Sequence, residues 1–288
     1  GNAVVLEGTQ GYKYLGVIED NSSMPTRESY IKLKNELFAR VERLCCTALN
    51  ANNLIKSINE HGINLIDFYV GLFRLEPADF RELDQGIRAV LNKHGAHLQP
   101  ACLERLYLPR DELGRGLHNV EHRSEQMLLQ LHNSLKQSAP VSTRRAAILK
   151  IENTDKTHLG IIKDYLEVKY NQTIYSDAGN EKAIDPRKLG EAQKAHLYSE
   201  ILKKTRHEKL YRVRSNQLVS IKDSSFWLKH GNVRPQDEAR YCFIQDRNMF
   251  GAENTLCPHA NSGQKLSITW LRSAIECSSM IIHGDTTR

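Results

Sequence analysis

Apolar residues recur every three or four positions along most of the chain. The first clear case is a helical face that carries Tyr30, Leu33, Leu37, Val41 and Leu44. The stretch before it, Tyr12 to Ile18, is apolar and aromatic, which predicts a short buried strand. The chain is therefore expected to begin with a small β element and to continue as helices.

The same spacing predicts further helices at 50–59, 65–73, 77–91 and 120–131. Gly62 is the expected break between the first two. Pro77 suits the first turn of a helix, and Gly95 suits the position just past its end. The segment Leu106 to Pro109 is expected to be extended.

Ser138, Ala139 and Pro140 predict a domain boundary. Beyond them, helices are predicted at 143–150, 158–170, 186–207, 225–230 and 235–248. The periodicity fades after Phe250. The pattern thus predicts a mainly α protein, with a helical bundle and a short β element followed by a second helical domain. The expected domains are 1–137, 138–250 and a tail at 251–288.

Positive charge is concentrated in the middle of the chain. The net charge is +6, and residues 138–215 hold 16 Lys and Arg against 10 Asp and Glu, so the remainder is neutral. A basic segment of this kind favours a polyanionic partner, although a modest surplus is also common on solvated helices.

The cysteines and the lengths of the apolar runs indicate in which cellular compartment the protein is expected. Six cysteines show no repeated spacing, which predicts free thiols in a reducing, intracellular environment. No apolar run approaches the ~20 residues of a membrane span, so no membrane partner is expected. The first residues do not form a targeting leader and read like the middle of a longer polypeptide.

The motifs of several catalytic classes are missing from the sequence. It contains no Gly-rich phosphate loop, no HExxH, no GxSxG and no CxxC. Polymerases hold two metal ions with neighbouring carboxylates, and no Asp-Asp pair occurs here. Asp177, which follows Tyr175-Ser176, is interpreted as a loop residue. We therefore predict no catalytic residue in this chain.

Four potential zinc ligands lie near the end of the sequence: Cys257, His259, Cys277 and His283. The first two are separated by one residue, whereas compact zinc sites place two to four residues between the first pair. Neither zinc nor any other cofactor is expected in this chain.

Several short motifs occur in a consistent order. The earlier ones are YKYLG at 12–16, a helix at 30–50, Lys56 with Ile58 and Asn59, FYVG at 68–71, and ELD at 82–84 with Arg88 and Leu91. The later ones are RLYLPR at 105–110, GRGL at 114–117 with Glu121, residues 193–211, SFWLKHG at 225–231, Glu238, and QDRN at 245–248. Together they resemble the region after the catalytic palm in reverse transcriptases of R2-like non-LTR retrotransposons.

The sequence departs from this family's pattern at two places. Leu113 stands where the family has the first Gly of its GGRGL signature. In the zinc knuckle, the first two cysteines are missing, Ile268 replaces the Glu and Arg272 replaces the His. The palm with its aspartates, where the parent enzyme would use Mg²⁺, lies outside this chain, as does the endonuclease.

The resemblance implies a thumb and linker that hold RNA or an RNA–DNA duplex by its backbone, in the nucleus, together with the upstream palm and fingers or other subunits. Basic side chains contact phosphates in such a role. The residues expected to do so are Lys13, Tyr14, Arg110, Arg115, Arg144, Arg145, Lys203, Lys204 and Arg206.

Three alternatives stay open from the sequence. Arg115 could pair with Glu112 or Glu121 and stabilise the Gly-rich turn instead of binding phosphate. The whole chain could be a structural or interaction protein of a ribonucleoprotein, derived from a retroelement that has lost polymerase activity. It could also be an unrelated helical adaptor.

Overall fold

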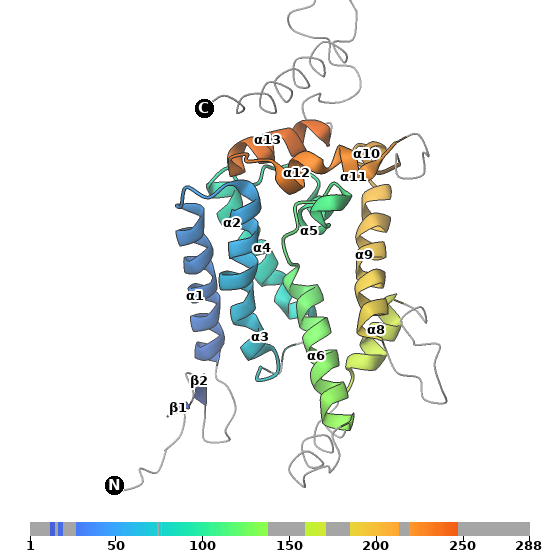
Figure 1. Ribbon diagram of the computed structural model, residues 1–288. Helices are drawn as coiled ribbons and strands as arrows, with labels where there is room; N and C mark the ends of the chain where they lie inside the picture. Colours follow the sequence, from blue (N-terminus) through green and yellow to red (C-terminus); the bar gives the residue numbers. More distant parts are fainter. Residues whose placement is uncertain are drawn as a thin grey trace, which may run out of the picture. The chain divides into compact units, whose positions relative to one another are not determined.

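The computed structural model describes residues 27–73, 75, 77–137, 159–170, 185–212 and 219–246, together with the backbone of 12–14 and 17–19. These residues are mainly helical, as predicted (Figure 1). The predicted strand at 12–18 is two short strands, β1 (Tyr12–Tyr14) and β2 (Val17–Glu19). They pair antiparallel, with Tyr12 opposite Glu19.

The helices up to residue 137 are α1 (Arg27–Cys45), α2 (Ala51–Ser57), the π-helix η1 (Ile58–Ile63), α3 (Asn64–Val70), the 3-10 helix η2 (Pro77–Phe80), α4 (Arg81–Lys93), α5 (Leu103–Tyr107), the 3-10 helix η3 (Arg110–Glu112) and α6 (Val120–Gln137). The later helices are α8 (Ile162–Tyr170), α9 (Pro186–Leu202), α10 (Glu208–Arg212), α11 (Ile221–Ser224), α12 (Phe226–His230) and α13 (Pro235–Gln245).

The apolar face predicted for α1 is confirmed. Leu33, Leu37 and Val41 are buried, while Tyr30 and Leu44 pack against the edge of the core. The core is built where α1 packs on α4, and where α3 and η2 pack on α6. Burial of these side chains is the main stabilising contribution, since each removes apolar surface from water.

Two local predictions were wrong. The break expected at Gly62 does not occur, because α2, η1 and α3 follow one another without interruption from Ala51 to Val70. The wider π-helical turn accommodates Gly62 inside a helical segment. The LYLP segment is only half extended: Leu106 and Tyr107 complete α5, and the backbone becomes extended at Leu108.

The segments predicted as separate domains, 1–137 and 138–250, contribute to one hydrophobic core. Leu128 and Leu129 of α6 belong to the same cluster as Ile162 and Leu166 of α8 and Leu189 of α9. The described residues up to Asp246 belong to a single compact unit. A smaller cluster joins the α5–η3 region to α9 and α10, and includes Leu108, Leu113, Tyr198, Ile201 and Tyr211.

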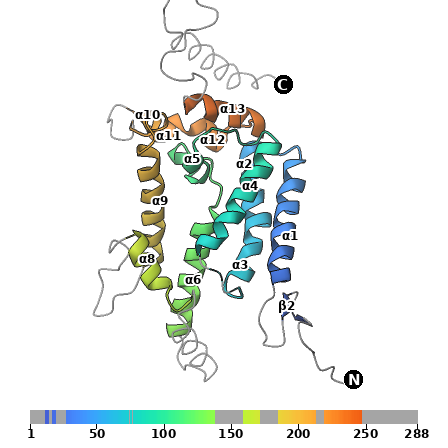
Figure 2. The same ribbon diagram turned by 180° about the vertical axis from the view of Figure 1, so that it is seen from behind.

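Figure 2 shows the same arrangement from behind, with α10, α11, α12 and α13 gathered at one end of the helical unit. The four cysteines within the described ranges, Cys45, Cys46, Cys102 and Cys242, are free thiols. In the described part of the chain, no helix combines the length and the apolar character needed to cross a bilayer.

Asp84 links α4 to the start of α6. Its carboxylate accepts hydrogen bonds from the backbone N–H groups of Val120 (2.9 Å) and Glu121 (3.1 Å). These are two of the N–H groups that a helix N-terminus leaves unpaired. Burial raises the pKa of Asp84 from its usual 3.8 to about 7, although both hydrogen bonds favour the ionised form.

Because the pKa of Asp84 is raised, we can predict how the stability of the wild type changes with pH relative to that of Asp84→Asn. The folded protein holds its Asp84 proton between pH 3.8 and about 7, whereas the unfolded chain has lost it. Wild-type stability should therefore fall relative to that of Asp84→Asn as the pH rises through this window. Urea unfolding of both proteins at about pH 5 and about pH 8 measures the difference. A difference that is independent of pH would contradict the assignment.

Candidate nucleic-acid interface

An open hollow of about 450 Å³ lies among α2, η3 and α12. Its lining consists of Asn52, Lys56, Arg110, Asp111, Lys229 and His230. These residues come from three distant parts of the sequence, and this end of the molecule also contains α10, α11 and α13 (Figure 1). We refer to this feature as the basic hollow.

Hydrogen bonds fix the three walls of the basic hollow to one another. The Asn52 side-chain amide donates to the backbone oxygen of Lys229 (3.0 Å), which joins α2 to α12. Arg110 donates to the Leu228 carbonyl (3.0 Å), and the Ser225 hydroxyl donates to the Asp111 carbonyl (3.0 Å). Side chains that line the hollow are therefore presented from a fixed backbone.

The basic hollow has an uncompensated positive charge. Lys56 and Lys229 are exposed, and neither forms an ion pair with another described residue. Asp111 is the one acidic residue in the lining. Arg110 shares the carboxylate of Glu238 with Arg115, so that two guanidinium groups face a single negative charge. The balance favours an anionic partner.

Two buried polar atoms in the lining keep hydrogen-bonding capacity. Asn52 Oδ1 and Arg110 Nε are inaccessible to solvent and have no hydrogen-bond partner within the described ranges. Buried polar atoms of folded proteins are usually paired, and unpaired ones mark strain or a binding function. One acceptor and one donor are thus left beside the two lysines.

Arg110 and Arg115, both predicted to contact phosphate, bind the same buried carboxylate in the structure. Arg110 Nη1 and Nη2 lie 2.7 Å and 2.8 Å from Glu238 Oε2, and Arg115 Nε lies 2.8 Å from Glu238 Oε1. The Arg115 side chain is 2% exposed and also donates to the Ala96 carbonyl at 2.6 Å. Arg115 therefore cannot contact a phosphate in this arrangement. Arg115 forms its ion pair with Glu238, and not with Glu112 or Glu121.

Arg105 is a third buried arginine in this region, and it forms its own set of polar contacts with α13. It is 1% exposed and donates to Leu113 O (2.8 Å), Cys242 O (3.0 Å) and Asp246 Oδ1 (2.9 Å). Asp246 also accepts the backbone N–H of Cys102 (3.0 Å). Arginine bonds of this kind attach α13 to α5 and η3, and they hold the segment on which Arg110 and Asp111 lie.

The other predicted basic residues are dispersed. Lys203 pairs with Glu200 (2.5 Å) and Lys204 with Glu104 (2.6 Å), while Arg206 is exposed. Lys13 and Tyr14 lie in β1, where only the backbone is described. Arg144 and Arg145 lie outside the described residues, as does the tail with Cys257, His259, Cys277 and His283. The structure therefore brings only Arg110 of the predicted set to the basic hollow.

Sequence reasoning missed Lys56 and Lys229 as candidate phosphate ligands. Both lie inside short sequence motifs described above, at 56–59 and 225–231. Each motif could have marked its lysine as a candidate, but the two positions are more than a hundred residues apart. Only the packing of α12 against α2 brings them to the same hollow.

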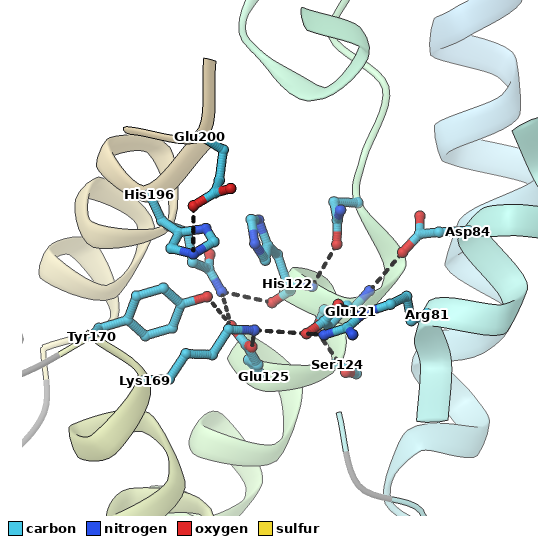
Figure 3. Close-up of polar contacts among 12 residues, drawn as sticks. Arg81, Asp84, Glu121, His122, Ser124, Glu125, Lys169, Tyr170, His196 and Glu200 are labelled. Carbon is cyan, nitrogen blue, oxygen red and sulfur yellow. Dashed lines mark hydrogen bonds and ion pairs between the residues drawn. The ribbon is translucent and has the colours of Figure 1, made fainter. Parts of the chain in front are cut away.

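A second group of charged side chains forms a buried polar network between α6, α8 and α9 (Figure 3). The Lys169 amine lies between two carboxylates, 2.7 Å from Glu121 and 2.6 Å from Glu125. Tyr170 and Gln193 donate to the other Glu125 oxygen at 2.8 Å and 2.7 Å. Arg81 also bonds Glu121.

The protein's own groups occupy both carboxylates of this network. Lys169 and Arg81 lower the pKa of Glu121 against the effect of burial, whereas burial raises the pKa of Glu125. Within the described ranges, no group of three metal-ligating side chains occurs. The arrangement joins α4, α6, α8 and α9 and leaves neither carboxylate open to a ligand, so its role is structural.

A second hollow, of about 280 Å³, lies between the start of α6 and α9. Its two cationic residues are already paired, Arg123 with Asp67 and Lys194 with Glu112. Burial lowers the pKa of His122, another lining residue, to about 3, so its ring is neutral. This hollow lacks the free positive charge that distinguishes the basic hollow.

Comparison with known proteins found no match to this chain among protein-family models, curated proteins or solved structures.

Proposed function

We propose that this chain is a non-catalytic, nucleic-acid-binding part of a retrotransposon-type RNA-directed DNA polymerase, acting in the nucleus. It holds RNA or an RNA–DNA duplex through backbone phosphates. The observation that carries the proposal is the basic hollow, in which Lys56 and Lys229 are both exposed and form no ion pair with a described residue. The ordered motifs from Tyr12 to Asn248 support the polymerase origin.

The chemistry of the basic hollow suits phosphate groups better than bases. Lysine ammonium groups bind phosphates as point charges, and each contact releases a condensed counterion. Contacts of this kind position a strand without reading its sequence, which is what a duplex-holding element requires.

The double substitution Lys56→Glu with Lys229→Glu should weaken binding of RNA and of RNA–DNA duplex by about tenfold or more at low salt. The logarithmic salt slope should become shallower by about 2, because two phosphate contacts are lost. Fluorescence anisotropy over a range of KCl concentrations measures both quantities. Circular dichroism checks that the variant remains helical.

A matched control is Lys32→Glu with Lys93→Glu. It makes the same change in net charge at exposed lysines that already pair with Glu28 and Glu42. If the control weakens binding as much as the test variant, the basic hollow is not the site. If the wild-type chain binds neither probe at low salt, the proposed function fails, and the alternative of a ribonucleoprotein interaction protein is favoured.

A further inference from the structure

Phe226 is an exposed aromatic side chain beside the basic hollow. It is 58% exposed, and its ring centroid lies 4.7 Å from that of His230, with 37° between the two planes. His230 is one of the residues that line the basic hollow. The neighbouring Trp227 is half-buried and packs edge-on against Tyr241, 5.9 Å away. Phe226, not Trp227, is therefore the ring presented to solvent here.

The helical register places positive charge around this ring. Ser225 N–H donates to Ile221 O (2.9 Å) and Lys229 N–H donates to Ser225 O (3.2 Å), so α12 continues the turn of α11. Residues three and four positions apart on such a segment are surface neighbours. Lys222 and Lys229 fall at these distances from Phe226 and are positively charged, and Asp223 contributes one negative charge.

We propose that Phe226 stacks on an unpaired nucleobase whose flanking phosphates contact the lysines of the basic hollow. This inference rests on the proposed function and specifies its substrate: a single strand, or the unpaired end of a duplex. A base inside a duplex is already stacked on both faces and offers no free face to the ring. Aromatic rings beside basic grooves bind single strands in this way, with little sequence preference.

Three probes separate base stacking from phosphate contact: an oligothymidylate of about 12 nucleotides, an abasic strand of the same length, and a blunt RNA–DNA duplex. The full chain should bind the oligothymidylate about tenfold more tightly than the abasic strand. Phe226→Ala should remove that preference and leave duplex affinity within about twofold. Phe226→Trp should retain it, because a larger ring still stacks.

Phe68→Ala is the matched control, since Phe68 on α3 is 54% exposed and is not part of the basic hollow. It should leave the preference for bases unchanged. Equal binding of normal and abasic strands by the wild-type chain, or an unchanged preference in Phe226→Ala, overturns the inference. If duplex binding remains salt-dependent in that case, the proposed function survives. If no probe binds, both fail.

Discussion

Replacing Glu238 by glutamine is expected to lower the free energy of unfolding by about 3–5 kcal/mol, because it removes one partner of a buried ion cluster. Glu238 is 2% exposed and receives Arg110 on one oxygen and Arg115 on the other. Burial already lowers the pKa of Arg110. Without the carboxylate, two guanidinium groups stay buried with no compensating charge. Urea unfolding followed by circular dichroism measures the loss.

The preceding residue provides the control. Asp237 also pairs with two arginines of the α13 region, Arg234 and Arg240, but those side chains are 79% and 68% exposed. Asp237→Asn should therefore cost no more than about 1 kcal/mol, as is usual for surface ion pairs. Equal losses in Asp237→Asn and Glu238→Gln would show that burial does not decide the contribution of this cluster.

The second large effect is expected for Gly114→Ala, which should cost about 3 kcal/mol. A Cβ atom at Gly114 would lie 2.0 Å from the backbone oxygen of Leu108. That oxygen cannot move freely, because it accepts the N–H of Gly116 at 2.8 Å. The turn would have to open, and Arg110 and Arg115, which flank Gly114 in sequence, would lose their positions against Glu238. Thermal unfolding monitored by circular dichroism tests this.

Gly190→Ala is the comparison, with the opposite expected sign. Gly190 lies inside α9, and the nearest atom to a Cβ there is the side-chain nitrogen of Gln126 at 4.0 Å. Alanine should stabilise the helix by about 0.5–1 kcal/mol, since it loses less conformational entropy on folding. Destabilisation of similar size in both variants would mean that the clash at Leu108 is not the cause.

The turn at 113–116 holds a non-glycine residue in a conformation that usually favours glycine. Leu113 adopts the left-handed conformation, with φ of 65°. For a residue with a side chain this conformation costs about 1–2 kcal/mol. The Leu113 side chain is 3% exposed and belongs to the smaller core cluster, so burial offsets that cost.

Local sequence patterns determined the helices of this protein. The faces of α1 and α4 follow the spacing of apolar residues, and Pro77, Pro186 and Pro235 each begin a helical element. Such features depend on a few neighbouring residues, which is why they can be read from the chain alone. Propensity failed at Gly62, where packing retained a helical turn that a glycine would disfavour.

The roles of the charged side chains could not be predicted from local sequence patterns in the same way. Arg110 and Arg115 flank a glycine-rich turn, and from the sequence a phosphate contact and a buried ion pair are equally consistent with that pattern. Their partner Glu238 lies more than a hundred residues further along the chain. The partner of a charged side chain, and hence its role, depends on which distant helix packs beside it.

The sequence by itself determined that the chain is mainly helical, where most helices lie and which faces they bury, because those properties are local. Tertiary structure decided how the charges are used. Packing of α12 and α13 against α2 and η3 buried Arg105 and Arg115 on acids, and brought Lys56 and Lys229 together around one hollow. Burial and long-range pairing of charged side chains arise only when segments far apart in sequence come into contact. Local sequence patterns therefore cannot predict them.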